Sequence, residues 1–476
     1  MIPQKHTKIV ATVGPASQDV EIIEKMILAG VNVFRLNFSH GDHHSHLKVI
    51  QTIKDIRTKL DRAVAILQDL SGPKIRLGKI SDEPMQVKAN DSIILDGAYK
   101  DSSKGNKIAI SYEKFADDVF PGARLLLADG DLELEVTSVE GTEVRCKVVI
   151  GGDLYSHKGV NFPTGSFNIP PLTEKDKTDL VFGLENKVDM VAMSFVRTAN
   201  DLRMAHDIFQ SVGHRVPLIA KIEKHEAIEN IEAIINVADG VMVARGDLGV
   251  EIEIESVPIV QKKIIRQTNL CGKPVITATQ MLKSMVDSPR PTRAEVTDVA
   301  NAVLDGTDAI MLSEETAVGE YPVKAVEMMA KIAIKAEEVS SYYKDARCPE
   351  NKTSSLIPDS VSHSAAVLSR DLNAKLIFAV TRTGYTAKAI SKFRPKSYIL
   401  ALTPDEDVYY QLSLIWGVVP VKYDLQKDQN TLFNDTFIIA KDLRIAQSGD
   451  HYVYASGFPL GEPGSINQIT AGRIPD

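Results

Sequence analysis

Two segments of this chain, P-L-I-A-K-I-E at residues 217–223 and G-V-M-V-A-R-G-D-L-G-V-E at residues 240–251, predict its fold. Each contains a short apolar run of the kind that forms a buried strand, and residues 227–235 between them carry apolar side chains at helical spacing. Such a unit places its two strands parallel, with their carboxyl ends side by side. We therefore expect an α/β fold built from strand–helix–strand units.

Charged residues gather where these two strands end. Lys221 and Glu223 close the first strand, and Arg245 and Asp247 follow the second. Two carboxylates at neighbouring strand ends can hold a hard divalent cation such as Mg2+ and leave positions on it for substrate oxygens. The alternative is that Glu223 and Asp247 are solvated loop acids with Lys221 as their salt-bridge partner. The rest of the chain favours the metal site.

Composition sets the broad class. The chain has 476 residues, 44% hydrophobic and 25% charged, which is typical of a globular protein of several domains. A net charge of −8 argues against a nucleic-acid partner. The three cysteines are far apart, which suggests a reducing compartment and no zinc site. We find neither an apolar signal segment nor a run long enough to span a membrane, so we expect a cytoplasmic protein.

The βα pattern continues on both sides of the central unit. Strands are expected at 8–13, 31–38 and 64–70, and five more at 190–195, 218–222, 241–244, 275–279 and 309–312. Helices are expected between them at 20–28, 47–60, 173–184, 202–212, 227–235, 259–269 and 293–304, with a last one at 322–339. Eight βα units predict a (β/α)8 TIM barrel, whose active site lies at the carboxyl ends of the strands.

Two further domains interrupt and follow the barrel. After the third strand, residues 77–167 show short alternating runs separated by glycine turns, which predicts an inserted all-β lid domain. After a linker, strands and helices alternate again, which predicts a C-terminal open α/β sheet domain. The expected boundaries are 1–72 and 168–342 for the barrel, 73–167 for the insertion and 343–476 for the C-terminal domain.

The predicted strand ends carry many charged and hydroxyl residues besides the central ones. They are Arg35, Asn37, Ser39, Asp69, Lys74, Arg76, Thr277, Thr279, Gln280, Ser313, Glu314 and Glu315. Such a rim suits a phosphorylated substrate and a metal, because phosphoryl transfer depends on positioning and on neutralising charge.

Seven segments of the chain, taken together, resemble the pyruvate kinase family. They are G-V-N-V-F-R-L-N-F-S-H-G (30–41), D-L-S-G-P-K-I-R (69–76), L-I-A-K-I-E (218–223), V-M-V-A-R-G-D-L-G-V-E (241–251), I-T-A-T-Q-M-L (276–282), P-R-P-T-R-A-E (289–295) and D-A-I-M-L-S-E-E-T (308–316). The resemblance covers the whole chain in order. It implies transfer of a phosphoryl group from phosphoenolpyruvate to ADP, which gives pyruvate and ATP, and it implies a homotetramer.

The same resemblance assigns roles to individual residues. It implies that Glu223 and Asp247 bind Mg2+ (or Mn2+), that Lys221 and Arg35 stabilise the phosphoryl group, and that Thr279 lies on the face of the enolate that is protonated. Backbone groups of Arg245, Gly246 and Asp247 would bind the substrate carboxylate. Asn37, Arg76 and Lys158 would contact the nucleotide under the lid.

One departure from the family pattern concerns K+. Many members hold K+ near Asn37, Ser39, Asp69 and the position of Leu70, with Thr where this chain has Leu70 and Glu where it has Lys74. We expect the ammonium group of Lys74 to take the place of K+, and hence substantial activity without K+. In the alternative, Lys74 faces solvent and K+ still binds.

An effector site is expected in the C-terminal domain. The segment T-R-T-G-Y-T (381–386) supplies Thr381, Thr383, Gly384 and Thr386 at a predicted helix start, a position that suits phosphate. The resemblance implies a phosphorylated allosteric effector there, with residues 461–467 as a second loop. The alternative is an ordinary helix start capped by Thr386.

Two other functions remain open from the sequence. The chain could be another phosphoenolpyruvate-using barrel enzyme, such as a lyase or aldolase, although these give no reason for a lid and nucleotide contacts. It could also be a non-catalytic metabolite sensor, although Lys221, Glu223, Asp247, Arg35 and Thr279 are intact.

Overall fold

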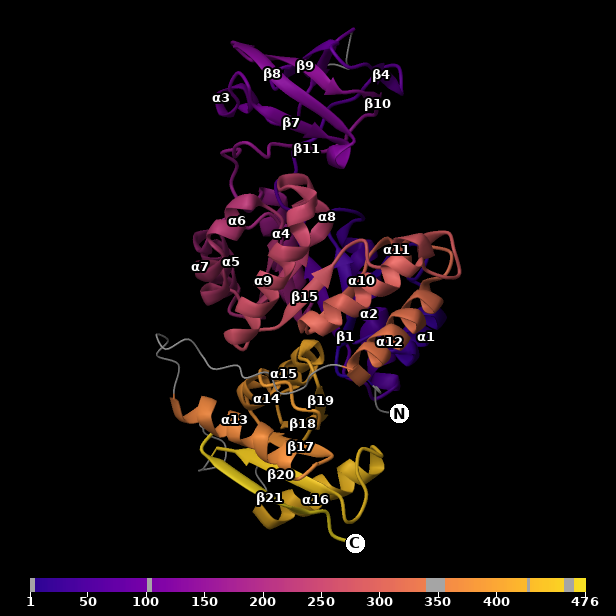
Figure 1. Ribbon diagram of the computed structural model, residues 1–476, viewed down its shortest axis with the longest axis vertical. Helices are drawn as coiled ribbons and strands as arrows, with labels where there is room; N and C mark the ends of the chain where they lie inside the picture. The colour runs from indigo at the N-terminus through magenta and orange to yellow at the C-terminus, as the bar shows by residue number, and fades with distance from the viewer. Residues whose placement is uncertain (1–4, 101–104, 340–355, 426–428, 458–465) are drawn as a thin grey trace.

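A computed structural model describes residues 5–100, 105–339, 356–425, 429–457 and 466–476. In these ranges the chain forms three domains arranged along the long axis of the molecule (Figure 1). The inserted domain lies at the top of that view, the barrel in the middle and the C-terminal domain at the bottom.

The central domain is a closed barrel of parallel strands in the order β1-β16-β15-β14-β13-β12-β3-β2. Its strands are β1 (Lys8–Val13), β2 (Val33–Asn37), β3 (Ala65–Asp69), β12 (Met190–Met193), β13 (Leu218–Ile222), β14 (Gly240–Ala244), β15 (Val275–Ala278) and β16 (Ala309–Leu312). The predicted TIM barrel is therefore confirmed. Its strands read as continuous apolar runs because both of their faces are buried.

Helices surround the barrel. They are α1 (Val20–Ala29), α2 (His43–Lys59), α4 (Glu174–Glu185), α5 (Ala199–Val212), α6 (His225–Glu229), α7 (Ile231–Val237), α8 (Arg245–Glu251), α9 (Val257–Leu270), α10 (Arg293–Asp305), α11 (Glu314–Ala317) and α12 (Pro322–Val339). Local signals fix several of their ends. Thr173 and Asp176 form a capping box at the start of α4, and Gly30 ends α1 with a φ of 119°.

The inserted domain follows β3 and is mostly β-structure, as expected. Its elements are β4 (Met85–Val87), β5 (Ser92–Asp96), β6 (Lys107–Ala109), α3 (Phe115–Asp118), β7 (Arg124–Leu127), β8 (Leu132–Glu140), β9 (Glu143–Ile150), β10 (Gly152–Leu154) and β11 (Val160–Asn161). Within its described part, β10 pairs with β4, and the other strands form one sheet in the order β11-β7-β8-β9-β5-β6.

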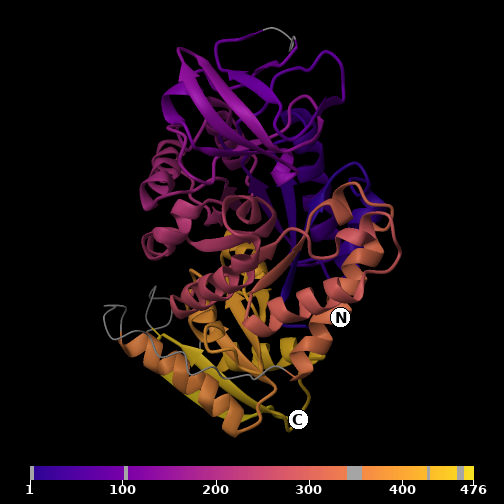
Figure 2. The same cartoon turned by 45° about the horizontal axis from the view of Figure 1, so that its top comes forward.

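The C-terminal domain is a sheet in the order β19-β18-β17-β20-β21, flanked by helices (Figure 2). Its elements are α13 (Leu356–Asp371), β17 (Leu376–Val380), α14 (Tyr385–Ser391), β18 (Tyr398–Thr403), α15 (Glu406–Gln411), β19 (Val418–Lys422), α16 (Gln429–Asp442), β20 (His451–Ser456) and β21 (Gln468–Arg473). Only the pairing of β20 with β21 is antiparallel in this sheet as described.

Several sequence expectations need correction. The single helix expected at 227–235 is two helices, α6 and α7, separated at Asn230. The strand expected at 190–195 ends at Met193, because Phe195 adopts a φ of 55° that is incompatible with a strand. Helix α8 was not expected at all, since its seven residues contain two glycines.

Candidate active site

The carboxyl ends of the barrel strands bring the predicted residues together from separate parts of the chain. Arg35 lies on β2, Asp69 closes β3, and Lys221 lies on β13 with Glu223 directly after it. Asp247 lies in the first turn of α8, immediately beyond β14. The parallel register of these strands therefore places the side chains at one end of the barrel.

Lys221 is the centre of this cluster. Its Nζ lies 2.9 Å from Oε1 of Glu223 and 3.2 Å from Oδ1 of Asp69, and it donates a hydrogen bond of 2.6 Å to Oγ of Ser194. The residue is only 8% exposed. The ammonium group is thus fixed in position by two carboxylates and a hydroxyl.

Asp69 links the two positively charged side chains of the site, Arg35 and Lys221. Its Oδ2 accepts a hydrogen bond of 2.6 Å from Nε of Arg35, while its Oδ1 faces Lys221. Nη1 of Arg35 donates to Oγ1 of Thr12 at 3.1 Å. Asp69 therefore orients the guanidinium and the ammonium groups together.

Glu223 lies close enough to Asp247 for the charge of Asp247 to act on it. Oε2 of Glu223 accepts a hydrogen bond of 2.8 Å from the backbone N–H of Phe195, which holds the carboxylate toward the rim. The carboxylate of Asp247 is part exposed and lies 3.8 Å from Nζ of Lys74. Repulsion from the carboxylate of Asp247 contributes to raising the pKa of Glu223.

The protonation equilibria follow from these contacts. Burial alone would lower the pKa of Lys221, but the carboxylates of Asp69 and Glu223 outweigh it and raise that pKa. Burial would raise the pKa of Asp69, but Lys221 and Arg35 hold it below its ordinary value. Burial, with a contribution from Asp247, raises the pKa of Glu223 although Lys221 opposes this shift.

Glu223 shares the ammonium group of Lys221 with Asp69. A divalent cation between Glu223 and Asp247 would supply further positive charge to these carboxylates. Two carboxylates with room for further oxygen ligands are a donor set that suits Mg2+ or Mn2+. The residues present therefore fit the metal that the sequence analysis expects.

Arg245, Gly246 and Thr279 form a second connected group beside α8. The guanidinium of Arg245 bonds Oδ1 of Asp298 at 2.7 Å and the backbone oxygen of Thr279 at 2.8 Å. The N–H of Gly246 donates to Oγ1 of Thr279 at 2.7 Å. Thr279 itself has a φ of 68°, in the left-handed region that residues other than glycine rarely adopt.

Of the three residues expected at the nucleotide, Asn37 is the register partner of Asp69, whereas Arg76 and Lys158 make their contacts within the inserted domain. Arg76 donates to the backbone oxygen of His157 at 3.0 Å, and Lys158 lies 5.9 Å from the ring centroid of Tyr155 in the inserted domain. Oδ1 of Asn37 accepts from the backbone N–H of Ser39 at 3.2 Å. These residues lie on the barrel rim and on the inserted domain that faces it (Figure 1).

Lys74 lies close to Asp247, one of the two candidate metal ligands. Its Nζ is 3.8 Å from Oδ1 of Asp247 and 3.9 Å from Oδ1 of Asp129 in the inserted domain. The backbone oxygen of Leu70, one of the expected K+ ligands, accepts a hydrogen bond of 2.7 Å from Oγ of Ser194. The positive charge of Lys74 thus lies at the edge of the candidate metal site.

The predicted effector segment lies between β17 and α14. Gly384 is the residue before α14 and has a φ of 79°, while Thr386 is buried in the first turn. The start of α14 therefore has no side-chain cap, and the alternative of a helix capped by Thr386 is not observed. Most of the second loop, 461–467, lies outside the described residues.

Some residues of the site were not found from the sequence. Ser194, Thr12 and Asp298 orient Lys221, Arg35 and Arg245 respectively. Ser194 could have been found, because it follows the fourth barrel strand as the other site residues follow theirs. Nothing in the sequence marks Thr12 or Asp298, since their contacts depend on side-chain directions in the folded barrel.

Two family models match the chain. The model described as the pyruvate kinase barrel domain matches residues 4–326, and the model described as the pyruvate kinase alpha/beta domain matches residues 359–470.

Individual proteins give the same result over the full length. The chain is 48% identical over 472 residues to pyruvate kinase 2 of Synechocystis sp., covering 98% of this chain and 78% of that protein. It is 43% identical over 473 residues to a pyruvate kinase of Clostridium perfringens, covering 99% and 100%. A crystal structure of a pyruvate kinase from Cryptosporidium parvum superposes with a TM-score of 0.93 at 36% identity, covering 99% of this chain and 97% of that one.

Proposed function

The chain belongs to the pyruvate kinase family and is a pyruvate kinase enzyme, and we propose that the Lys221 cluster is the place where its reaction occurs. In this reaction the P–O bond of phosphoenolpyruvate breaks and the phosphoryl group passes to a β-phosphate oxygen of ADP. The enolate that remains takes a proton and becomes pyruvate. The observation that carries the proposal is the buried contact of Lys221 with Asp69, Glu223 and Ser194.

We propose that Arg35 and Lys221 hold the phosphoryl group from two sides. Both groups are oriented by Asp69, so neither has to reorganise when negative charge moves during transfer. A divalent cation held by Glu223 and Asp247 would supply Lewis-acid stabilisation of the phosphoryl and enolate oxygens. In phosphoryl transfer this positioning and charge neutralisation provide most of the catalysis.

The segment at the start of α8 is proposed to bind the substrate carboxylate through backbone N–H groups of Gly246 and Asp247. The present hydrogen bond from Gly246 to Thr279 shows that these two residues are within reach of each other. Thr279 would then lie beside the enolate and deliver its proton through water. The Arg245 contacts with Asp298 and Thr279 would keep this segment in place.

The nucleotide is proposed to lie between the rim and the inserted domain. Asn37, Arg76 and Lys158 would contact it, and closure of the inserted domain would exclude water from the transferring phosphoryl group. A coupled assay of pyruvate formation with phosphoenolpyruvate, ADP and Mg2+ tests the reaction. Replacing Lys221 in the same assay tests whether the reaction occurs at the Lys221 cluster.

Activity without K+ is proposed from the position of Lys74 beside Asp247. The ammonium group would supply the positive charge that K+ supplies in family members with Glu at this position. Turnover in K+-free buffer is the test. We expect it to stay within about tenfold of the rate in K+, and a loss of a hundredfold or more would contradict the proposal.

A phosphorylated effector is proposed for the segment Thr381, Thr383, Gly384 and Thr386. Support comes from the uncapped start of α14, where backbone N–H groups remain for an anion. Isothermal titration with sugar phosphates and with AMP is the test, and absence of binding for all of them would contradict it. A homotetramer is proposed from the family alone, and sedimentation velocity would test it.

Within the described ranges, no helix combines the length and the apolar character needed to cross a membrane.

A further inference from the structure

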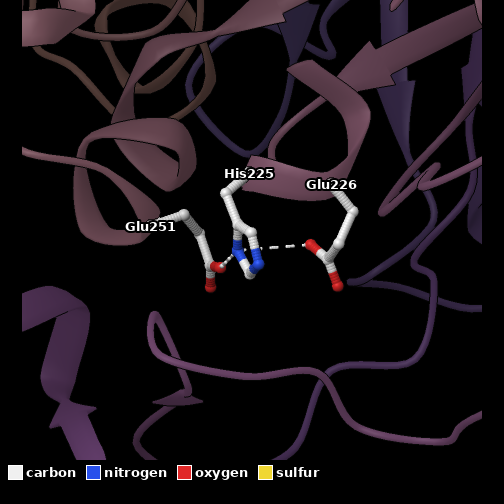
Figure 3. A group of neighbouring side chains, drawn as sticks. All are labelled: His225, Glu226 and Glu251. Carbon is white, nitrogen blue, oxygen red and sulfur yellow. Dashed lines mark ion pairs between the residues drawn. The ribbon is translucent and has the colours of Figure 1, made fainter. Parts of the chain in front are cut away.

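Three potential metal ligands converge beside the rim, outside the Lys221 cluster. His225 and Glu226 begin α6, and Glu251 ends α8, so two different helices bring them together (Figure 3). Nδ1 of His225 lies 3.3 Å from Oε2 of Glu226 and 3.5 Å from Oε2 of Glu251. The imidazole thus lies between two carboxylates (Figure 3). His225, Glu226 and Glu251 were not singled out from the sequence.

The three facing atoms are buried and lack hydrogen bonds. Nδ1 of His225, Oε2 of Glu226 and Oε2 of Glu251 have no hydrogen-bond partner, although each is almost inaccessible to solvent. Glu251 is only 3% exposed as a whole residue. Leaving a buried polar atom without a partner is unfavourable. Besides their ion-pair contacts with one another, these three atoms form a donor set that a cation could share.

The second oxygen of Glu251 is fully occupied. Its Oε1 accepts a hydrogen bond of 2.8 Å from Nδ2 of Asn161 and lies 2.6 Å from Nζ of Lys224. These contacts fix the orientation of the carboxylate and leave Oε2 directed at His225. Outer contacts of this kind are how proteins orient metal ligands.

A proton on His225 cannot satisfy the group. Nδ1 carries at most one N–H, and that bond can point to only one of the two carboxylate oxygens. A metal ion can contact all three atoms at once. In a tetrahedral zinc site with bonds of about 2.0–2.1 Å, neighbouring ligand atoms are about 3.4 Å apart. The three atoms here lie within 4.8 Å of one another, and two of their separations are 3.3 and 3.5 Å.

We propose that His225, Glu226 and Glu251 form a second divalent-metal site that selects Zn2+ over Mg2+. The imidazole is the reason for this selectivity, because Mg2+ prefers oxygen ligands whereas Zn2+ readily binds nitrogen. Three protein ligands leave a fourth position on zinc for water or for an oxygen of a bound molecule.

The site is connected to the inserted domain. Asn161, which holds Glu251, lies on β11 of that domain, whereas the three ligands belong to the barrel. Zinc bound to Glu251 would therefore stabilise the contact of Glu251 with Asn161, which joins the barrel to the inserted domain. The proposal does not depend on how Lys221 and Asp247 act in the reaction.

Equilibrium dialysis of the full chain against Zn2+ tests the proposal, with excess Mg2+ present to occupy the Glu223–Asp247 site. We expect about one zinc ion per chain to bind under these conditions. Co2+ in place of Zn2+ should give the visible absorption of a four-coordinate site. The variant His225→Gln should weaken zinc binding about 100-fold or more, and Glu226→Gln should weaken it at least tenfold.

Two matched variants locate the ion. His44→Gln changes an exposed histidine at the start of α2 and should leave zinc binding intact. Glu223→Gln disables the proposed magnesium site and should also leave the Mg2+-resistant zinc in place. Circular dichroism melting shows whether each variant folds. If His225→Gln fails to fold, zinc binding by Glu226→Gln, which preserves side-chain shape, decides the result.

Two results would overturn the inference. One is the absence of stoichiometric zinc binding to the wild-type chain in excess Mg2+. The other is zinc binding that survives in His225→Gln and Glu226→Gln but disappears in Glu223→Gln, because the ion would then occupy the magnesium site.

Discussion

A single buried ammonium group connects the acids of the candidate active site. Lys221 contacts Asp69 and Glu223, and each of these carboxylates has a further partner, Arg35 for Asp69 and the backbone of Phe195 for Glu223. Such a network keeps its geometry in the absence of substrate. This is the property needed for electrostatic stabilisation, because the charges are in place before the phosphoryl group moves.

Replacing Lys221 tests this role. Lys221→Met should lower kcat about 10²–10³-fold while the KM for phosphoenolpyruvate changes much less, because the ammonium group acts on charge that develops during transfer. Steady-state kinetics of pyruvate formation gives both constants. Lys262→Met, on the exposed face of α9, is the control and should retain wild-type kinetics. An equal increase in KM with unchanged kcat would contradict the assignment.

Lys74 allows a second test at the level of one residue. Lys74→Glu reverses the charge beside Asp247 and should make turnover depend on K+, with a loss of about tenfold or more in K+-free buffer that added K+ restores. Rates at increasing K+ concentration measure this effect. Lys88→Glu makes the same change in net charge at an exposed position of the inserted domain and should show no K+ requirement. A K+-independent Lys74→Glu enzyme would exclude the proposed replacement of K+ by Lys74.

At the scale of elements, the barrel strands were predicted well because each is a continuous apolar run buried on both faces. β13 and β16 have the predicted bounds. Four strands of the inserted domain, β4, β7, β10 and β11, were not predicted, whereas β6, also short, was expected at 107–110. β4, β10 and β11 have only two or three residues, which is too short to show the alternation of apolar and polar side chains typical of a strand. β7 reads R-L-L-L and does not alternate either.

The end of α12 provides a pH-dependent contact between elements. The carboxylate of Glu337 accepts hydrogen bonds from the backbone N–H groups of His6 (2.8 Å) and Thr7 (2.7 Å), just before β1. Burial would raise the pKa of Glu337, but these contacts and the His6 side chain hold it below its ordinary value of 4.5. The folded state therefore binds this proton more weakly than the unfolded state does.

This contact should stabilise the protein at neutral pH. The stabilisation should be lost as the pH falls below about 4.5 and passes the lowered pKa of Glu337. Glu337→Gln should lower the free energy of unfolding at pH 7 by about 1–3 kcal/mol. The difference from wild type should shrink as the pH decreases. Urea unfolding at several pH values measures it, with Glu338→Gln as the exposed neighbour for control. A difference that is constant with pH would rule out this role.

At the scale of the whole molecule, the order of domains was predictable because the βα pattern stops after β3 and resumes at α4. The contacts between domains were not predictable from the sequence, because they depend on which surfaces pack together in the folded protein. Arg394, after α14, bonds both oxygens of Asp308 beside β16 at 2.9 and 3.0 Å. Both residues are almost fully buried, so this ion pair joins the C-terminal domain to the barrel.

Removing this ion pair should weaken the coupling of the two domains. Arg394→Met leaves the carboxylate of Asp308 buried with fewer partners, and we expect a loss of about 3–5 kcal/mol in the free energy of unfolding. Calorimetry should show the transitions of the barrel and the C-terminal domain moving apart. Lys335→Met removes an exposed ion pair with Glu338 and should cost less than about 1 kcal/mol. Equal losses for the two variants would contradict the interpretation.

The proposed reaction requires Glu223 and Asp247, at the ends of neighbouring barrel strands, to share one divalent cation beside Lys221. The most direct measurement is the anomalous difference density of a crystal of this protein soaked with Mn2+. We expect a peak within about 2.2 Å of one carboxylate oxygen from each of Glu223 and Asp247. A strong peak that touches neither residue, or an empty site at saturating Mn2+, would contradict it.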